Sequence, residues 1–255
     1  NSSPSGWYHN FLKKIIYKKI ISWADKVVVN SFEFKRQMDK RFNIKSKCIL
    51  NPLNIKSIIS QSKKGKSDIF FKTKKKSLKL INLGRYTKQK SQITILKAAQ
   101  ILKKHLNFRL LILGRGSEKK NMQKFIEDNN LKNYVKLKDF IDNPFRLIKE
   151  SDIFILSSKY EGLPNVLLEA ACLKKLIIST KCPTGPKEIL SNGKGGIYFK
   201  IDDYQDLASK IKYVIKNEKL MKKKIQFCYK NLHRYNYKKN LDKYYFLTRS
   251  LISSN

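Results

Sequence analysis

From residue 78 onward the sequence alternates between short apolar runs and longer amphipathic segments. Six runs have the length and apolar content of buried strands, at residues 78–83, 108–113, 134–137, 152–156, 176–178 and 197–199. Apolar residues recur with helical spacing over residues 91–104, 118–129, 144–149, 165–173 and 203–215. Because continuously apolar strands are buried on both faces, the alternation predicts an α/β domain with a parallel sheet covered by helices, over residues 78–225.

The earlier part of the chain lacks this regular alternation. Its periodicity predicts helices over residues 11–21 and 31–42, and short strands over residues 26–30 and 48–52. These elements are too few to form a stable domain of their own. We therefore interpret residues 1–55 as the remnant of another domain.

Two further segments differ in composition from the predicted sheet domain. Residues 56–77 are rich in lysine, with few periodic apolar positions, which is typical of a solvated linker or loop. Residues 226–255 are predicted to be helical. The tyrosines and leucines of this last segment suggest that it returns toward the first domain.

The net charge of +37 comes from 56 basic and 19 acidic residues. Only eight of the basic residues are arginines, whereas nucleic-acid recognition relies heavily on the planar arginine side chain. The lysines are also spread over almost every segment. Two interpretations stay open: a compositional bias of an AT-rich genome, and a selected attraction to anionic surfaces, membrane lipid before nucleic acid.

Metal and membrane signals are absent from the sequence. The cysteines show no metal-ligand spacing, at positions Cys48, Cys172, Cys182 and Cys228. No run approaches the ~18 apolar residues of a membrane-spanning helix, and no signal peptide is visible. We expect a protein of the reducing cytoplasm, free or at the inner face of the cytoplasmic membrane.

A candidate phosphate-binding loop follows the first predicted strand of the sheet domain. Gly84 lets the backbone approach a ligand closely, and Arg85 and Lys90 offer a planar guanidinium and a mobile ammonium to phosphate oxygens. Ligands of such sheets bind at the carboxyl ends of the strands. The Gly-Arg-Gly turn at residues 114–116 lacks the third glycine of the dinucleotide fingerprint, so it indicates either a plain turn or a close backbone approach to a ligand.

A second candidate loop follows the fourth predicted strand. The chain turns through Glu161 and Gly162, and Pro164 is placed at the first position of the next helix. The unpaired N–H groups of that helix start would form an anion site. Glu169 lies roughly 7.5 Å further along the helix axis, within reach of a hydroxyl of the same ligand.

These segments together resemble glycosyltransferase family 4. Glu161 and Glu169 make the E-x7-E pattern of these retaining enzymes, within the closely matching run Glu-Gly-Leu-Pro-Asn-Val-Leu-Leu-Glu-Ala. Gly84-Arg85 with Lys90 looks like the family's diphosphate-binding loop. The resemblance implies the GT-B fold: a Rossmann-like, nucleotide-sugar-binding domain over residues 78–225 and, over residues 1–55, the tail of a second, acceptor-side Rossmann-like domain.

The resemblance also implies residue roles. Arg85 and Lys90 would hold the donor diphosphate and stabilise the leaving group, Glu161 would contact the transferred sugar, and these three would be the catalytic residues. Glu169 would bind the ribose. The implied donor-binding residues are Gly84, Arg85, Lys90, Phe140, Glu161, Gly162, Leu163, Pro164, Asn165 and Glu169. No metal and no cofactor are implied, since cationic side chains and the helix start would serve as the electrophile.

The implied function is transfer of a sugar from a nucleotide diphosphate sugar, UDP being the commonest donor nucleotide. The acceptor would be a bacterial glycan or a polyprenyl- or lipid-linked saccharide, in polysaccharide or lipopolysaccharide biosynthesis. Two alternatives are a glycoside hydrolase with Glu161 and Glu169 as its paired carboxylates, and a non-enzymatic basic module for nucleic acid or membrane. Because most of the acceptor-side domain is missing by this comparison, we expect the chain alone to be inactive.

Overall fold

The computed structural model describes residues 11–65, 67–72 and 76–253. Its strands are β1 (Val28–Val29), β2 (Lys47–Cys48), β3 (Leu78–Leu83), β4 (Phe108–Leu113), β5 (Val135–Lys138), β6 (Ile153–Leu156), β7 (Leu176–Thr180) and β8 (Ile197–Phe199). The α-helices are α1 (Phe11–Ser22), α2 (Phe32–Phe42), α3 (Ile55–Lys63), α4 (Gln92–Leu102), α5 (Lys119–Asp128), α6 (Phe145–Glu150), α7 (Asn165–Cys172), α8 (Gly185–Ile189), α9 (Tyr204–Lys216), α10 (Glu218–Lys230) and α11 (Tyr237–Ile252). Short 3-10 helices are η2 (Ile69–Phe71), η3 (Ser191–Gly193) and η4 (Asn231–Tyr235).

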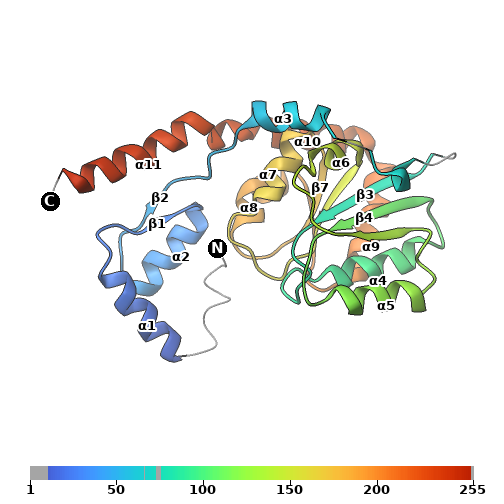
Figure 1. Ribbon diagram of the computed structural model, residues 1–255, viewed down its shortest axis with the longest axis horizontal. Helices are drawn as coiled ribbons and strands as arrows, with labels where there is room; N and C mark the ends of the chain where they lie inside the picture. The colour runs from blue at the N-terminus through green and yellow to red at the C-terminus, as the bar shows by residue number, and fades with distance from the viewer. Residues whose placement is uncertain (1–10, 66, 73–75, 254–255) are drawn as a thin grey trace.

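Strands β3 to β8 form a parallel sheet in the order β5-β4-β3-β6-β7-β8 (Figure 1). This is the Rossmann order, in which the chain builds one half of the sheet outward from β3 and then returns to build the other half from β6. The two halves meet between β3 and β6, where the ladder is short and the buried Asn82 side chain donates to the Ile155 carbonyl at 2.8 Å. The predicted α/β fold with a parallel sheet is confirmed.

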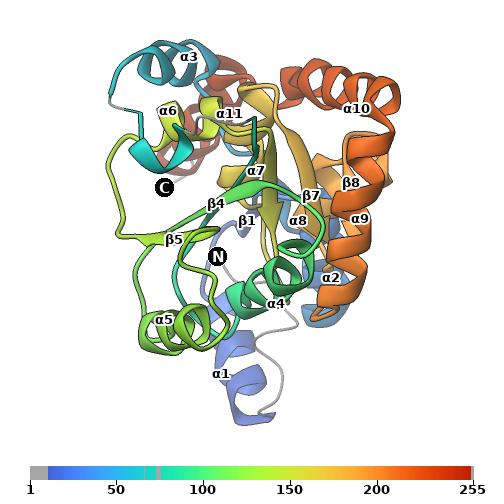
Figure 2. The same cartoon turned by 90° about the vertical axis from the view of Figure 1, so that its right-hand side faces the viewer.

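Alternate residues of each central strand enter two separate hydrophobic clusters. In β6, Ile153 and Ile155 pack with α4, α5 and α9, while Phe154 and Leu156 pack with α3, α6 and α7. Figure 2 shows the helices on the two faces of the sheet. Every position of β6 is therefore buried, which explains why the strands are continuously apolar in the sequence.

Residues 11–48 form a smaller unit beside the sheet domain (Figure 1). Here β1 and β2 pair in parallel, and α2 packs on them through Met38 and Phe42. The two predicted helices of this region are confirmed, and β1 lies within the strand predicted over residues 26–30. The strand predicted over residues 48–52 is corrected: β2 overlaps it only at Cys48, and the chain from residue 49 to residue 52 is not a strand. Helix α11 lies along this unit, and the Tyr244 hydroxyl donates to the Ile49 carbonyl at 3.5 Å, so the last helix does return to the N-terminal region.

Two boundaries predicted from composition are corrected. The linker expected over residues 56–77 contains α3 and η2, and Ile58 and Phe71 are buried in the core. Lysines interrupt the apolar spacing of this segment. In the structure its described lysines are exposed, while the isoleucines on one face of α3 pack on α6 and α7. The boundary expected at residue 225 falls inside α10.

We expect Gly116→Ala to destabilise the sheet domain. A β-carbon there would lie 2.2 Å from the Tyr86 carbonyl oxygen, in backbone that cannot easily withdraw, because the Tyr86 N–H also donates to the Arg115 carbonyl. The free energy of unfolding should fall by about 3 kcal/mol and the Tm by about 6–12 °C. Thermal unfolding measures this. Gly84→Ala is the matched control, because its β-carbon would meet side-chain atoms at an ordinary 3.6 Å; equal losses in both variants would contradict the argument.

Candidate functional site

A cavity of about 600 Å³ opens at the carboxyl ends of β3 and β6. This is the point where the strand order reverses, and the loops that leave the two strands diverge there. The loop after β3 contributes Arg85 and Lys90, and the start of α7 contributes Asn165 and Glu169. Cationic side chains, a helix start and the carboxylates of Asp142 and Glu169 therefore line the same cavity.

Lys90 and Glu161 form an ion pair at the base of this arrangement. The Lys90 Nζ lies 2.5 Å from the Glu161 Oε1, and the Ser158 hydroxyl donates to the same oxygen at 2.6 Å. Glu161 is only 5% exposed. A carboxylate buried to this extent requires a cation and hydrogen-bond donors, and Lys90 and Ser158 supply them. The pair fixes the direction in which the Lys90 ammonium approaches the cavity.

The loop of residues 84–91 is held by hydrogen bonds to the loop that follows β6. Gln89 donates to the Tyr160 carbonyl at 2.9 Å, the Lys159 N–H donates to the Gln89 carbonyl at 2.9 Å, and the Ser157 hydroxyl donates to the Lys90 carbonyl at 2.7 Å. The two loops behave as one unit because each supplies donors to the backbone of the other. Lys90 is thus placed by backbone contacts as well as by its ion pair.

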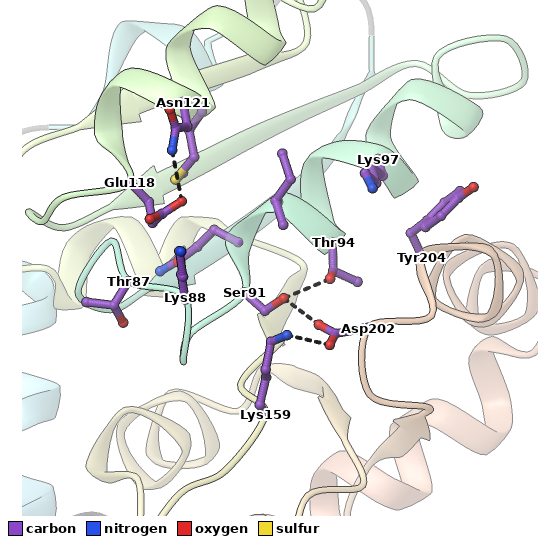
Figure 3. Close-up of a pocket in the computed structure, with 13 residues that line it drawn as sticks. Thr87, Lys88, Ser91, Thr94, Lys97, Glu118, Asn121, Lys159, Asp202 and Tyr204 are labelled. Atoms are coloured by element: carbon purple, nitrogen blue, oxygen red, sulfur yellow. Dashed lines mark hydrogen bonds and ion pairs between the residues drawn. The ribbon is translucent and has the colours of Figure 1, made fainter. Parts of the chain in front are cut away.

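A second cavity, of about 480 Å³, lies against the same loop between the starts of α4, α5 and α9 (Figure 3). Here Asp202 joins two elements, because it accepts from the Ser91 hydroxyl at 2.7 Å and pairs with the Lys159 Nζ at 2.6 Å. Burial alone would raise the pKa of Asp202, but hydrogen bonds from Lys159 and Ser91 outweigh it and lower the pKa. This charged contact links Ser91, at the end of the loop, to Lys159 in the loop after β6.

Helix α7 begins beside the first cavity with its N–H groups unpaired in the helix itself. Pro164, expected at the first helical position, is instead the extended residue that precedes the helix. Glu169 stands further along α7, and burial raises the pKa of its carboxyl. Within the described part of the chain no side chain donates a hydrogen bond to this carboxylate. A half-buried carboxylate without a partner is a group that a ligand hydroxyl could satisfy.

The structure brings most of the predicted donor-binding residues together. The cavity lining includes Gly84, Arg85, Lys90, Phe140, Pro164, Asn165 and Glu169. Glu161, Gly162 and Leu163 do not line it; they are buried beside it, and Glu161 reaches the site through Lys90. Among the residues that the structure describes, no group of His, Cys, Asp or Glu side chains could hold a metal ion. Nor does any helix in this part of the chain have the length and apolar content to cross a bilayer.

Arg115 also lines the cavity, and the sequence did not predict it as a ligand-binding residue. Its guanidinium carbon lies 5.7 Å from the centre of the Phe140 ring, so cation and ring stack at one wall. Phe140 is 57% exposed, so its side chain is accessible to a ligand in the cavity. The sequence feature that could have indicated this role is the position of Arg115 in the Gly-Arg-Gly turn after β4, since β4 is the neighbour of β3 in the sheet.

Residues 65–231 match the family Glycosyl transferases group 1. The chain belongs to this family. The matched segment contains every residue that lines the cavity, so the family similarity and the geometry of the site concern the same part of the molecule.

Known relatives agree with this membership. An uncharacterized glycosyltransferase of Methanocaldococcus jannaschii is 34% identical over 197 residues, covering 74% of this chain and 48% of the relative. The Campylobacter jejuni enzyme N-acetylgalactosamine-N,N'-diacetylbacillosaminyl-diphospho-undecaprenol 4-alpha-N-acetylgalactosaminyltransferase is 26% identical over 226 residues, covering 88% of this chain and 57% of the enzyme. The chain spans about half the length of the curated relatives it matches.

Solved structures show the same fold. The Anabaena protein HepE in complex with UDP superposes with a TM-score of 0.83 at 16% identity, covering 98% of this chain and 70% of that protein. A glycosyltransferase of Rickettsia africae gives a TM-score of 0.80 at 20% identity, with 96% of this chain and 68% of that protein covered. The predicted GT-B fold is therefore confirmed.

We expect Glu169→Gln to stabilise the protein at neutral pH. Because burial raises the pKa of Glu169 in the folded state, the folded protein favours the protonated carboxyl and loses stability as the pH rises from the ordinary carboxyl pKa through the raised one. The amide cannot ionise, so the gain over the natural chain should be larger at pH 7 than at pH 4. Urea unfolding at both pH values measures it. The control Glu218→Gln, on the exposed start of α10, should show no gain; an equal gain there would refute this explanation.

Proposed function

We propose that this chain carries the donor site of a retaining glycosyltransferase that uses a nucleotide diphosphate sugar, with UDP as the nucleotide. The observation that supports this most is the convergence of Arg85, Lys90, the α7 start and Glu169 on one cavity where the strand order reverses. Family membership favours this function over a non-enzymatic basic module. The two anion-binding features also favour it over a glycoside hydrolase, which has no diphosphate to bind.

Arg85 and Lys90 would hold the diphosphate. An arginine fork pairs with two phosphate oxygens, and the lysine ammonium adds a mobile charge beside it. When the bond between the anomeric carbon and the diphosphate oxygen breaks, negative charge grows on that oxygen. Cations and helix N–H groups placed there in advance lower the barrier. The proposed reaction needs no bound metal, because these groups neutralise the leaving group.

The two glutamates would have different roles. Glu169, half-buried and without a donor from the described residues, would accept hydrogen bonds from ribose hydroxyls. Glu161 is paired with Lys90 before any ligand binds. A diphosphate that draws the Lys90 ammonium toward itself would release part of the Glu161 carboxylate for a hydroxyl of the donor sugar. Phosphate binding and sugar binding are thereby linked through one ion pair.

The donor nucleotide is inferred from the comparisons. HepE was solved with UDP, and so was the Staphylococcus aureus protein TarM. The name of the Campylobacter jejuni relative describes transfer of N-acetylgalactosamine to a saccharide linked to diphospho-undecaprenol. We propose an acceptor of the same chemical class, a glycan or a polyprenyl-linked saccharide. Its binding surface would include residues 11–48 and further residues of a whole acceptor-side domain.

We expect UDP to bind this chain with an affinity that a metal chelator does not change. Arg85→Ala should weaken binding at least about tenfold, because a charge-assisted, bidentate contact is lost. Isothermal titration with and without chelator gives both results. Lys88→Ala is the matched control: it removes a cation from the same loop, but Lys88 lines the second cavity and not the first. Strict dependence on a divalent metal, or equal losses in both variants, would overturn the proposed site.

A lipid-linked acceptor also leads us to propose contact with an anionic membrane through α1. This helix exposes Ile16 and Ile20, with Lys18 and Lys19 beside them, and Trp23 directly after the helix is exposed as well. Apolar side chains next to lysines suit the boundary between acyl chains and anionic headgroups.

We expect the chain to sediment with vesicles that contain an anionic phospholipid more than with purely zwitterionic vesicles. Ile20→Asp should reduce this binding because it places a charge among the exposed apolar residues of α1. The control Ile201→Asp changes an exposed isoleucine in the turn after β8 and should bind as before. Equal binding to both kinds of vesicle would exclude the electrostatic attraction.

A further inference from the structure

A carboxylate of the sheet domain caps α2, the second helix of the N-terminal unit. The Glu188 Oε2 accepts hydrogen bonds from the Ser31 hydroxyl at 2.7 Å, from the Phe32 N–H at 2.9 Å and from the Glu33 N–H at 3.4 Å. Ser31 is fully buried and also caps α2 itself, through its contact with the Phe34 N–H at 3.2 Å. A negative charge at a helix start is favourable because the helix dipole is positive there.

The opposite end of the short helix α8 is fixed to the backbone next to Glu161. The Thr184 hydroxyl donates to the Glu161 carbonyl, and the Gly185 N–H donates to the Gly162 carbonyl at 2.8 Å. A β-carbon at Gly185 would lie 1.9 Å from that carbonyl oxygen, so the two backbones touch. Five residues of helix therefore join the loop of the E-x7-E pattern directly to the cap of α2.

Glu188 is held at this position with one oxygen unsatisfied. Its Oε1 is buried and has no hydrogen-bond partner among the described residues. Arg234 donates to the Glu188 backbone carbonyl at 3.2 Å, which holds the residue but does not pair with its carboxylate oxygens. An unpartnered buried carboxylate oxygen costs free energy. Packing of the two units does not explain why the Glu188 carboxylate lies between them. A role of this carboxylate in joining the two units does explain it.

We propose that Glu188 is a positioning residue that transmits nucleotide binding to α2 and so aligns the N-terminal unit with the donor site. In this proposal the diphosphate binds Lys90 and shifts the Lys90–Glu161 ion pair. The carbonyls of residues 161 and 162 then move, and α8 moves with them because it is hydrogen-bonded to both. Glu188, near the other end of α8, in turn shifts the start of α2. This inference rests on the proposed function, since a nucleotide must bind at the first cavity.

Amide hydrogen exchange, followed by NMR on the 255-residue chain, tests the cap and the transmission separately. Without nucleotide, Glu188→Ala should speed exchange of the Phe32 and Glu33 amides about tenfold, because a tenfold change corresponds to the loss of one charge-assisted hydrogen bond. Glu188→Gln keeps an acceptor oxygen and should show a smaller increase. With saturating UDP, exchange at these two amides should slow in the natural chain and stay unchanged in Glu188→Ala.

The controls separate transmission from loss of folding or of nucleotide binding. Glu33→Gln neutralises a carboxylate in the same helical turn but leaves the bonds to Glu188 in place, so its α2 amides should still respond to UDP. Titration should give the same UDP affinity, within about twofold, for Glu188→Ala and the natural chain, because Glu188 lies outside the first cavity.

Each contrary result has a distinct meaning. An α2 response to UDP that persists in Glu188→Ala would overturn the proposed transmission. UDP binding with no change at α2 in the natural chain would do the same, while leaving the proposed function intact. Absence of UDP binding would overturn the proposed function and the transmission together. Unchanged exchange in Glu188→Ala without nucleotide would show that Glu188 does not secure the start of α2.

Discussion

Burial of the parallel sheet on both faces is the constraint on which the rest of this molecule depends. Strands β3 to β8 use their backbone groups in the ladder and their side chains in two hydrophobic clusters. The side chains that bind a ligand must therefore come from the segments that follow the ends of the strands. Because the strand order reverses between β3 and β6, the loops after these two strands diverge and open a cavity rather than covering the sheet edge.

For ligand binding in that cavity, a few charged side chains held in position matter more than the net charge of +37 of the whole chain. Most lysines lie on the surface, where water and salt screen them. Lys90 differs because Glu161 and the backbone of the loop after β6 hold it in one direction. Arg85, Arg115 and the start of α7 surround the same volume. A pre-positioned cation stabilises growing negative charge without the cost of reorganising solvent.

The contacts around α8 give this site a connection to the N-terminal unit. Hydrogen bonds at one end of α8 reach the carbonyls of residues 161 and 162, and Glu188 at the other end caps α2. Residues 11–48 have their own small apolar cluster, and the half-buried Cys48 packs against both this cluster and one cluster of the sheet domain. Polar contacts across this boundary can respond to a ligand more readily than a continuous apolar core, because few packed side chains must move.

The strands of the sheet, its parallel character, the loop that carries Arg85 and Lys90 and the helix that carries Glu169 could be predicted from the sequence, because apolar period and glycine position are local properties of the chain. Three features became visible only in the tertiary structure. Helix α3 was hidden because lysines interrupt its apolar spacing. Glu161 is shielded beside the cavity rather than lining it, and Glu188 caps a helix that begins 156 residues earlier in the sequence. Such contacts form between segments that are far apart in the sequence. A local sequence pattern cannot show which distant segment a residue will pack against.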